Sequence, residues 1–114
     1  MNLLIISLSQ LDYKEDVFLA LQSAGIQKAS IWDAKNLNQS LESEFSLFNG
    51  FFGGGSAHEG ERLIIFAHIK KVEDAKEFLT NLEAGGIPVK TDNILSMYVV
   101  PTTLTFDQET GILE

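Results

Sequence analysis

The chain has 114 residues, 45% of them hydrophobic, which is enough for one globular domain with a modest core and unlike the composition of a disordered segment. Sixteen acidic and eight basic residues give a net charge of −8, and the lysines are scattered, which argues against nucleic-acid binding. The absence of cysteine excludes disulfides, thiolate chemistry and cysteine-ligated zinc, and it fits a cytoplasmic protein.

The N-terminal stretch MNLLIISLSQ is apolar but too short to cross a bilayer, with no basic residue before it and no cleavage pattern after it. We therefore expect a buried first strand at Leu3–Leu8 and a single soluble domain over residues 1–114. A helix is predicted next, with Asp12 as its N-cap and Glu15 as the capping-box partner. Gly25 is predicted to end this helix, and Lys28–Ala34 to form the second strand.

The second half of the chain repeats this pattern. LIISLSQLDYKEDVFLALQSAGI and LIIFAHIKKVEDAKEFLTNLEAGGI both open with Leu-Ile-Ile and close on glycine and isoleucine. The pattern predicts a strand at Leu63–Ile69, a helix that Gly85 and Gly86 stop, and a last strand at Leu95–Val100 before Pro101. The order βαββαβ predicts an α+β, ferredoxin-like sandwich: a four-stranded antiparallel sheet with both helices on one face.

The first and third predicted strands, LLIISL and LIIFA, are apolar on both faces. A sheet with one face in water should alternate apolar and polar residues, so a second layer must cover the face that the helices leave bare. The chain has no spare helix for that purpose. We therefore expect an obligate oligomer with the sheets packed inward.

A long connection, residues 35–60, joins the second and third strands where a short turn would suffice, which indicates a functional or flexible loop. Its glycines do not match a phosphate-binding loop, and His58 with Glu59 and Glu61 is too small a ligand set for a metal site. No converging acid, base or nucleophile predicts an enzyme, and His68 on an apolar strand is expected in the core or in an interface. The aromatic and glycine residues of the loop are predicted to bind a protein partner; they are Phe48, Phe51, Phe52, Gly53, Gly54 and Gly55.

The segment SAGIQKASIWDAKNLNQSL, residues 23–41, and the ending Tyr98-Val99-Val100-Pro101 resemble the PII nitrogen-regulatory superfamily, with asparagines where that family has glycines before its T-loop. The resemblance implies a homotrimer that binds adenine nucleotides in clefts between subunits. It also implies a loop that reports to a transporter or enzyme, so that a membrane is reached only through such a partner. No cofactor is assigned beyond that nucleotide. The ligand-binding residues expected are Lys35, Asn36, Asn38, Gln39, Arg62 and Lys90.

Two alternatives stay open. The segments GIPVKTDNILS and PTTLTFDQETG lack the family's basic residues, which favours a trimeric interaction module without nucleotide binding. The other alternative, ranked third, is a CutA-like trimer, which shares the architecture and binds divalent metals. No role is assigned to the C-terminal tail, residues 102–114, although Gly111, Ile112 and Leu113 suggest a turn and an apolar anchor on a neighbouring subunit.

Overall fold

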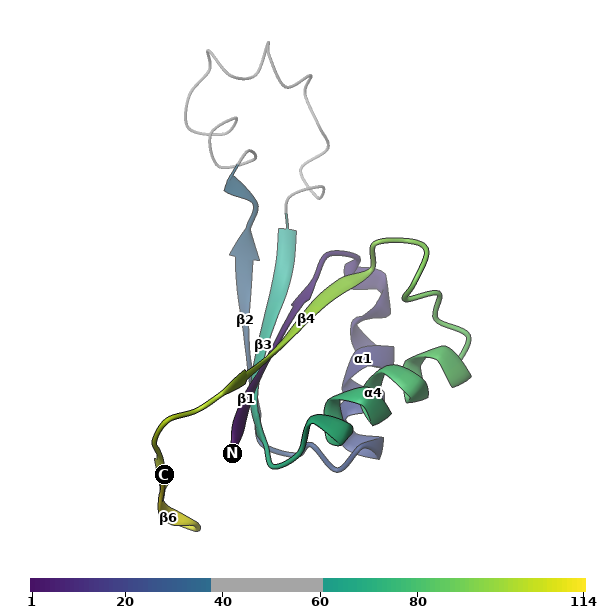
Figure 1. Ribbon diagram of the computed structural model, residues 1–114. Helices are drawn as coiled ribbons and strands as arrows, with labels where there is room; N and C mark the ends of the chain where they lie inside the picture. Colours follow the sequence, from purple (N-terminus) through teal and green to yellow (C-terminus); the bar gives the residue numbers. More distant parts are fainter. Residues whose placement is uncertain (38–60) are drawn as a thin grey trace.

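The computed structural model describes residues 1–37 and 61–114. Four antiparallel strands form one sheet in the order β2-β3-β1-β4, and two α-helices pack on it (Figure 1). The elements are β1 (Asn2–Leu8), α1 (Lys14–Ser23), β2 (Ala29–Lys35), β3 (Glu61–Ile69), α4 (Val72–Ala84) and β4 (Leu95–Pro101). The α+β prediction is confirmed, and the arrangement is compatible with a ferredoxin-like fold.

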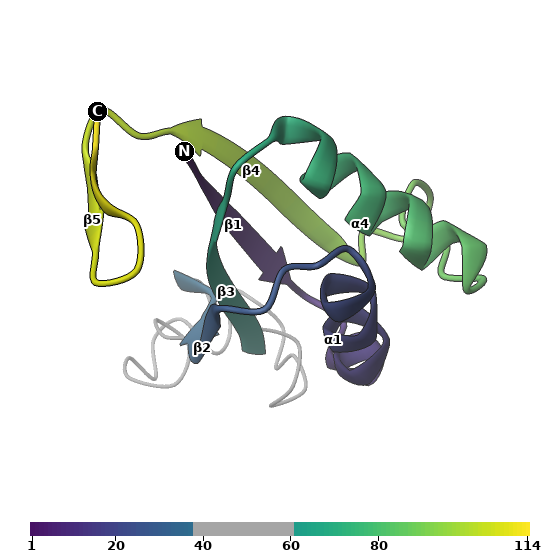
Figure 2. The ribbon, with the colours of Figure 1, turned by 90° about the horizontal axis from the view of Figure 1, so that it is seen from below.

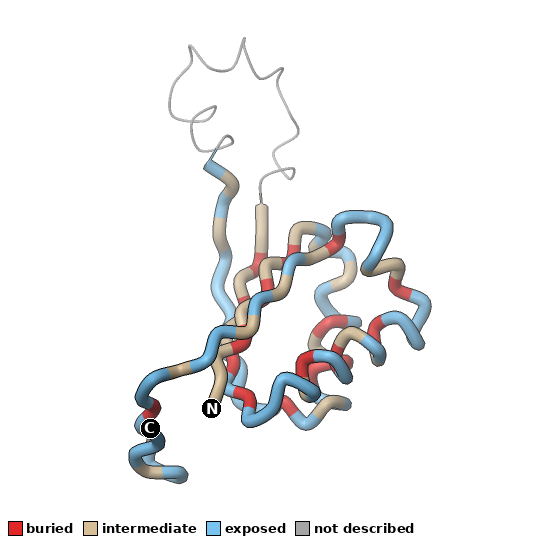
Figure 3. Tube along the Cα trace, viewed as in Figure 1, coloured by how far each residue is buried: buried red, intermediate tan, exposed pale blue. Residues whose placement is uncertain are grey.

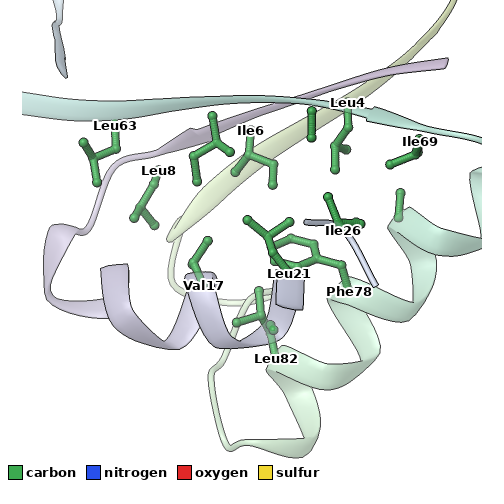
Figure 4. Packing of buried hydrophobic residues seen from close by; sticks show 14 of the residues in the cluster. Leu4, Ile6, Leu8, Val17, Leu21, Ile26, Leu63, Ile69, Phe78 and Leu82 are labelled. Atoms are coloured by element: carbon green, nitrogen blue, oxygen red, sulfur yellow. The ribbon is translucent and has the colours of Figure 1, made fainter. Parts of the chain in front are cut away.

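The core lies between the two helices and one face of the sheet (Figure 4). Leu4, Ile6 and Leu8 of β1 are fully buried, and they alternate with side chains that point to the other face, as the pleat of a strand requires. On the helix side, Val17 of α1 and Phe78 of α4 are also fully buried. The two helices therefore cover the same sheet face, as the sequence predicts.

Both helices end in the same way. The amide of Ile26 donates to the carbonyl of Leu21 at 2.9 Å, and Ile87 donates to Leu82 at 3.0 Å. Gly25 and Gly86 precede these isoleucines with φ of +79° and +85°, the left-handed conformation that glycine adopts without strain. Each isoleucine is buried at the helix end, so the repeat seen in the sequence is a repeat of structure.

The start of α1 differs from the prediction. A 3-10 helix, η1 (Leu11–Tyr13), precedes α1, and the residue before the first α-helical turn is Tyr13, whose side chain makes no capping hydrogen bond. Asp12 lies inside this turn, so its assignment as N-cap with Glu15 was wrong. Leu11 and Tyr13, on either side of Asp12, are partly buried and pack against the core, which accounts for the turn that includes Asp12.

The C-terminal tail forms a small hairpin that the sequence analysis did not predict. Strands β5 (Thr105–Asp107) and β6 (Gly111–Leu113) make a separate two-stranded sheet. Figure 2 shows the hairpin on the side of the main sheet away from the helices. Thr102 Oγ1 donates to the carbonyl of Met1 at 2.9 Å and lies 2.8 Å from Thr105 Oγ1, so hydrogen bonds tie the base of the hairpin to the N-terminus.

Neither α1 nor α4, nor any other helix in residues 1–37 and 61–114, is long and apolar enough to cross a membrane.

Candidate functional site

A hollow of about 510 Å³ lies where β2 ends and β3 begins, at the base of the long connection. Lys35 is the last residue of β2 and pairs with Glu61, the first residue of β3, and Ala34 pairs with Arg62. We call this site the charged hollow. Its lining residues are Leu11, Asp33, Ala34, Lys35, Glu61 and Arg62.

The charged hollow combines cations and carboxylates. Lys35 and Arg62 bring two positive charges, and Asp33 and Glu61 bring two negative ones. Arg62 is half-buried, and its Nη1 donates to Ser7 Oγ at 3.3 Å, which holds the guanidinium against β1. An anionic phosphate chain entering the hollow would therefore meet two carboxylates as well as the two cations.

The other predicted ligand residues are not all brought together. Asn36 directly follows Lys35 and is half-buried, whereas Asn38 and Gln39 lie outside the described residues. Lys90 does not line the charged hollow: it lies in the loop between α4 and β4, with Nζ 3.6 Å from Glu83 Oε1. Because β2 and β4 are the two edges of the sheet, one chain cannot place Lys35 and Lys90 along the same edge. The predicted partner-binding residues, Phe48 to Gly55, also lie outside the described residues.

The sheet face away from the helices, here called the open face, is mostly apolar. Trp32 of β2 stacks on Phe66 of β3, with ring centroids 4.4 Å apart and an interplanar angle of 19°. Phe66 pairs with Ile5 of β1, and Ile5 pairs with Tyr98 of β4, so a row of large side chains crosses the sheet. The large apolar side chains of the open face are Leu3, Ile5, Trp32, Ile64, Phe66, Tyr98 and Val100.

Much of this face remains accessible to solvent. Trp32 is 49% exposed, Tyr98 57% and Val100 44%. The two-faced apolar pattern of the strands predicts such a surface, but the aromatic stack could not be predicted. Trp32 and Phe66 are far apart in the sequence, and only the strand register brings their rings together.

His68 lies on the open face as well, in the row with Leu3 and Val100. It is exposed, because alternation along β3 buries Ala67 and Ile69 and points His68 the other way. Of the two predicted places for His68, the core is therefore wrong and an interface stays a prediction. In residues 1–37 and 61–114, no group of three or more potential ligands from histidine, cysteine, aspartate and glutamate could hold a metal ion. His58 is not among these residues.

Comparison of the chain with protein-family models and with curated proteins gives no match. Its function is therefore inferred from the charged hollow and the open face.

Proposed function

We propose that this chain is a non-enzymatic PII-like regulatory protein with a ferredoxin-like fold. In this proposal it forms a homotrimer through its open face, binds a small ligand between subunits, and contacts a protein target through residues 35–60. The observation that carries the proposal is the open face, an apolar surface that spans the whole width of the sheet.

The physical basis is the exposure of large side chains that no other part of residues 1–37 and 61–114 covers. Trp32, Tyr98 and Val100 each keep about half of their surface in water. Full burial of a large apolar side chain is worth ~1.5–3 kcal/mol, so covering the exposed half contributes on the order of 1 kcal/mol per residue. Repeated in each subunit, that gain supports assembly with the open faces inward.

Assembly would also explain how the predicted ligand residues cooperate. Lys35 lies at the β2 edge and Lys90 in the loop that leads into the opposite edge strand. In a ring of subunits, Lys35 of one copy would face the Lys90 loop of the next. A cleft between subunits would then have more positive charge than the charged hollow of one chain.

A second candidate is a trimeric interaction module that binds no nucleotide. The balanced charges of the charged hollow favour it, because Asp33 and Glu61 oppose the approach of a phosphate chain. The two candidates share the assembly and differ only in the ligand.

The assembly is tested by measuring the mass in solution of the unchanged chain and of Tyr98→Lys. A lysine in a packed apolar interface is costly to bury, so Tyr98→Lys is expected to reduce the trimer to monomers. Leu19→Lys is the matched control, since Leu19 lies on α1 and is 62% exposed, close to the 57% of Tyr98. A monomeric unchanged chain, or equal masses for both variants, would refute the proposal.

The ligand is tested by thermal unfolding with ATP, ADP, AMP, cyclic AMP, 2-oxoglutarate, bicarbonate and divalent metals. At 100 times the dissociation constant, a bound ligand stabilises the protein by ~2.7 kcal/mol. A regulatory role predicts that one nucleotide stabilises the trimer and is recovered unchanged, and that Lys35→Ala and Lys90→Ala weaken the effect. Lys76→Ala, on the exposed surface of α4, is the control. A trimer that no nucleotide stabilises would instead support the interaction module.

A further inference from the structure

The outer edge of β2 is a place where another strand can be added. Among the described residues, β2 pairs only with β3, so the backbone groups along its other side have no strand partner. Six of its seven residues are exposed, and its sequence ASIWDAK contains no proline. In Figure 3 the strand is drawn mostly in the pale blue of exposed residues. Native proteins usually protect such an edge, because it is a template for pairing with a further strand.

An apolar groove of about 300 Å³ runs beside this edge on the helix side of the sheet. We call it the edge groove. It exists because α1 leaves part of β2 uncovered, and Ile31 is consequently 46% exposed. The residues that line it are Phe18, Leu21, Gln22, Ile26, Gln27, Ala29, Ile31 and Ile65. An added strand would direct alternate side chains into this groove and the others toward Trp32.

The C-terminal hairpin is short and exposes large apolar side chains. Each of its strands has three residues, and an isolated two-stranded hairpin is at best marginally stable in water. Phe106 and Ile112 are directly paired across it and are 71% and 68% exposed. Leu104, just before β5, is 60% exposed. This cluster of large apolar side chains is not buried by the part of its own chain that the structure describes.

The excess positive charge beside β2 is already paired within one chain. The ion pair between Lys28 Nζ and Glu109 Oε1 holds the hairpin at the beginning of β2 and not along its edge. The side chains of β2 itself carry no net charge, since Lys35 and Asp33 cancel, so the edge carries no net negative charge to oppose the two other carboxylates of residues 104–114, Asp107 and Glu114. The exposed Phe106 shows that the hairpin does not fill its own edge groove.

We propose that the C-terminal hairpin of a second copy of this chain pairs with the outer edge of β2 and inserts Phe106 and Ile112 into the edge groove. The contact is heterologous, since a hairpin on one copy meets a strand edge on the next, and under rotational symmetry it closes into a ring. The contact uses the outer edge of β2 and the edge groove, and on the other side of the sheet it adjoins Trp32 of the open face. It goes beyond the proposed function, which assigns no contact to the β2 edge or to the C-terminal hairpin.

Cross-linking between two single-cysteine chains tests the contact. The natural sequence has no cysteine, so every disulfide formed reports only the introduced pair. Ile31→Cys chains are mixed with Phe106→Cys chains that carry a tag of different size, and mixed disulfides are quantified under mild oxidation. A disulfide needs Cα atoms within about 7 Å, so only close approach of the two sites gives a rapid product. We expect at least tenfold more mixed disulfide than from Leu19→Cys chains with the same Phe106→Cys partner.

Equal yields from Ile31→Cys and Leu19→Cys would overturn the proposal, because random collisions would explain both. It would also be overturned if a chain with both Ile31→Cys and Phe106→Cys closed mainly on itself as a monomer, since the hairpin would then occupy its own groove. To separate this result from the open-face test, the mixed disulfide is also measured in chains that carry Tyr98→Lys. A disulfide yield that persists there shows the β2-edge contact without the open face, whereas a yield that falls to that of the Leu19→Cys control shows that the contact does not form on its own.

Discussion

Substitution of Gly86 by alanine isolates a purely backbone effect at the end of α4. Gly86 has φ of +85°, and a methyl group built on it would meet no atom within 4 Å. Crowding by residues elsewhere in the chain therefore contributes nothing. What remains is the local cost of the left-handed backbone, in which Cβ lies close to the following carbonyl oxygen, and for an L-residue it is about 1–2 kcal/mol. Alanine also restricts the conformations of the unfolded chain, which lowers the entropy lost on folding and offsets part of this cost. We expect Gly86→Ala to lower the free energy of unfolding by roughly 1 kcal/mol.

The preceding residue supplies the matched control. Gly85 has φ of −81°, and a methyl group there would lie 3.5 Å from the carbonyl oxygens of Asn81 and Leu82, which is ordinary contact. Gly85→Ala is therefore expected to stabilise the protein by about 0.4–1 kcal/mol through the unfolded state. Gly86→Asn should cost less than Gly86→Ala, because asparagine tolerates the left-handed region better than other residues. Two adjacent substitutions of the same chemistry thus have opposite signs.

Urea unfolding followed by circular dichroism measures all three variants at one protein concentration. If two-state behaviour holds, the midpoints are expected to rank Gly85→Ala above the unchanged chain and Gly86→Ala below it. Gly25→Ala is expected to behave like Gly86→Ala, since Gly25 has φ of +79° and nothing within 4 Å of its added methyl group. The reasoning would be refuted if Gly86→Ala were neutral, or if Gly85→Ala and Gly86→Ala destabilised the protein equally.

Three further predictions follow from burial and electrostatics. Phe78 is fully buried, so Phe78→Ala should lower the free energy of unfolding by about 3–5 kcal/mol, measured with a denaturant. Leu19→Ala, on the exposed side of α1, should change it by less than about 0.5 kcal/mol. Similar losses in the two variants would contradict the packing described. Hydrogen bonds from Thr110 lower the pKa of Asp107 below its ordinary 3.8, so this carboxylate stabilises the hairpin above that pH and the contribution is lost as the pH falls through the lowered pKa. The NMR chemical shift of the Thr110 amide should change with pH as these hydrogen bonds are lost. A shift that does not change with pH, or a pH dependence that is the same in Asp107→Asn, would contradict the role of Asp107. Trp32 is the only tryptophan and is half-exposed, so assembly through the open face should reduce its quenching by iodide as protein concentration rises, and constant quenching would count against that assembly.

The regular elements could be predicted because their signals are local. Glycines at 25 and 86 mark the helix ends, and the short apolar runs at residues 3–8 and 63–69 mark the two central strands. Those signals depend on residues that are close together in the sequence, and the structure contains the helices and strands that they predict. The N-terminus of α1 could not be predicted in the same way, because packing of the partly buried Leu11 and Tyr13 against the core competes with the capping preference of Asp12.

The surfaces that carry the proposals depend on contacts between distant parts of the chain. The open face was predicted as an apolar sheet face, but its aromatic stack needed the register of β2 against β3. The charged hollow joins Lys35 to Arg62 as expected. It also contains Asp33 and Glu61, which were not among the predicted ligand residues, and it leaves Lys90 elsewhere. The C-terminal hairpin was missed because strands of three residues have too short a pattern to recognise.

The sequence by itself determined the order of strands and helices and the apolar character of both sheet faces, since hydrophobic periodicity and helix-ending glycines act locally. Only the tertiary structure decided which charges share a hollow, which aromatic rings stack and which strand edge stays open. These properties arise from strand order and register, in which residues more than 30 positions apart become neighbours, such as Trp32 and Ile64. No local pattern encodes that pairing, because it is selected by the packing of the whole core.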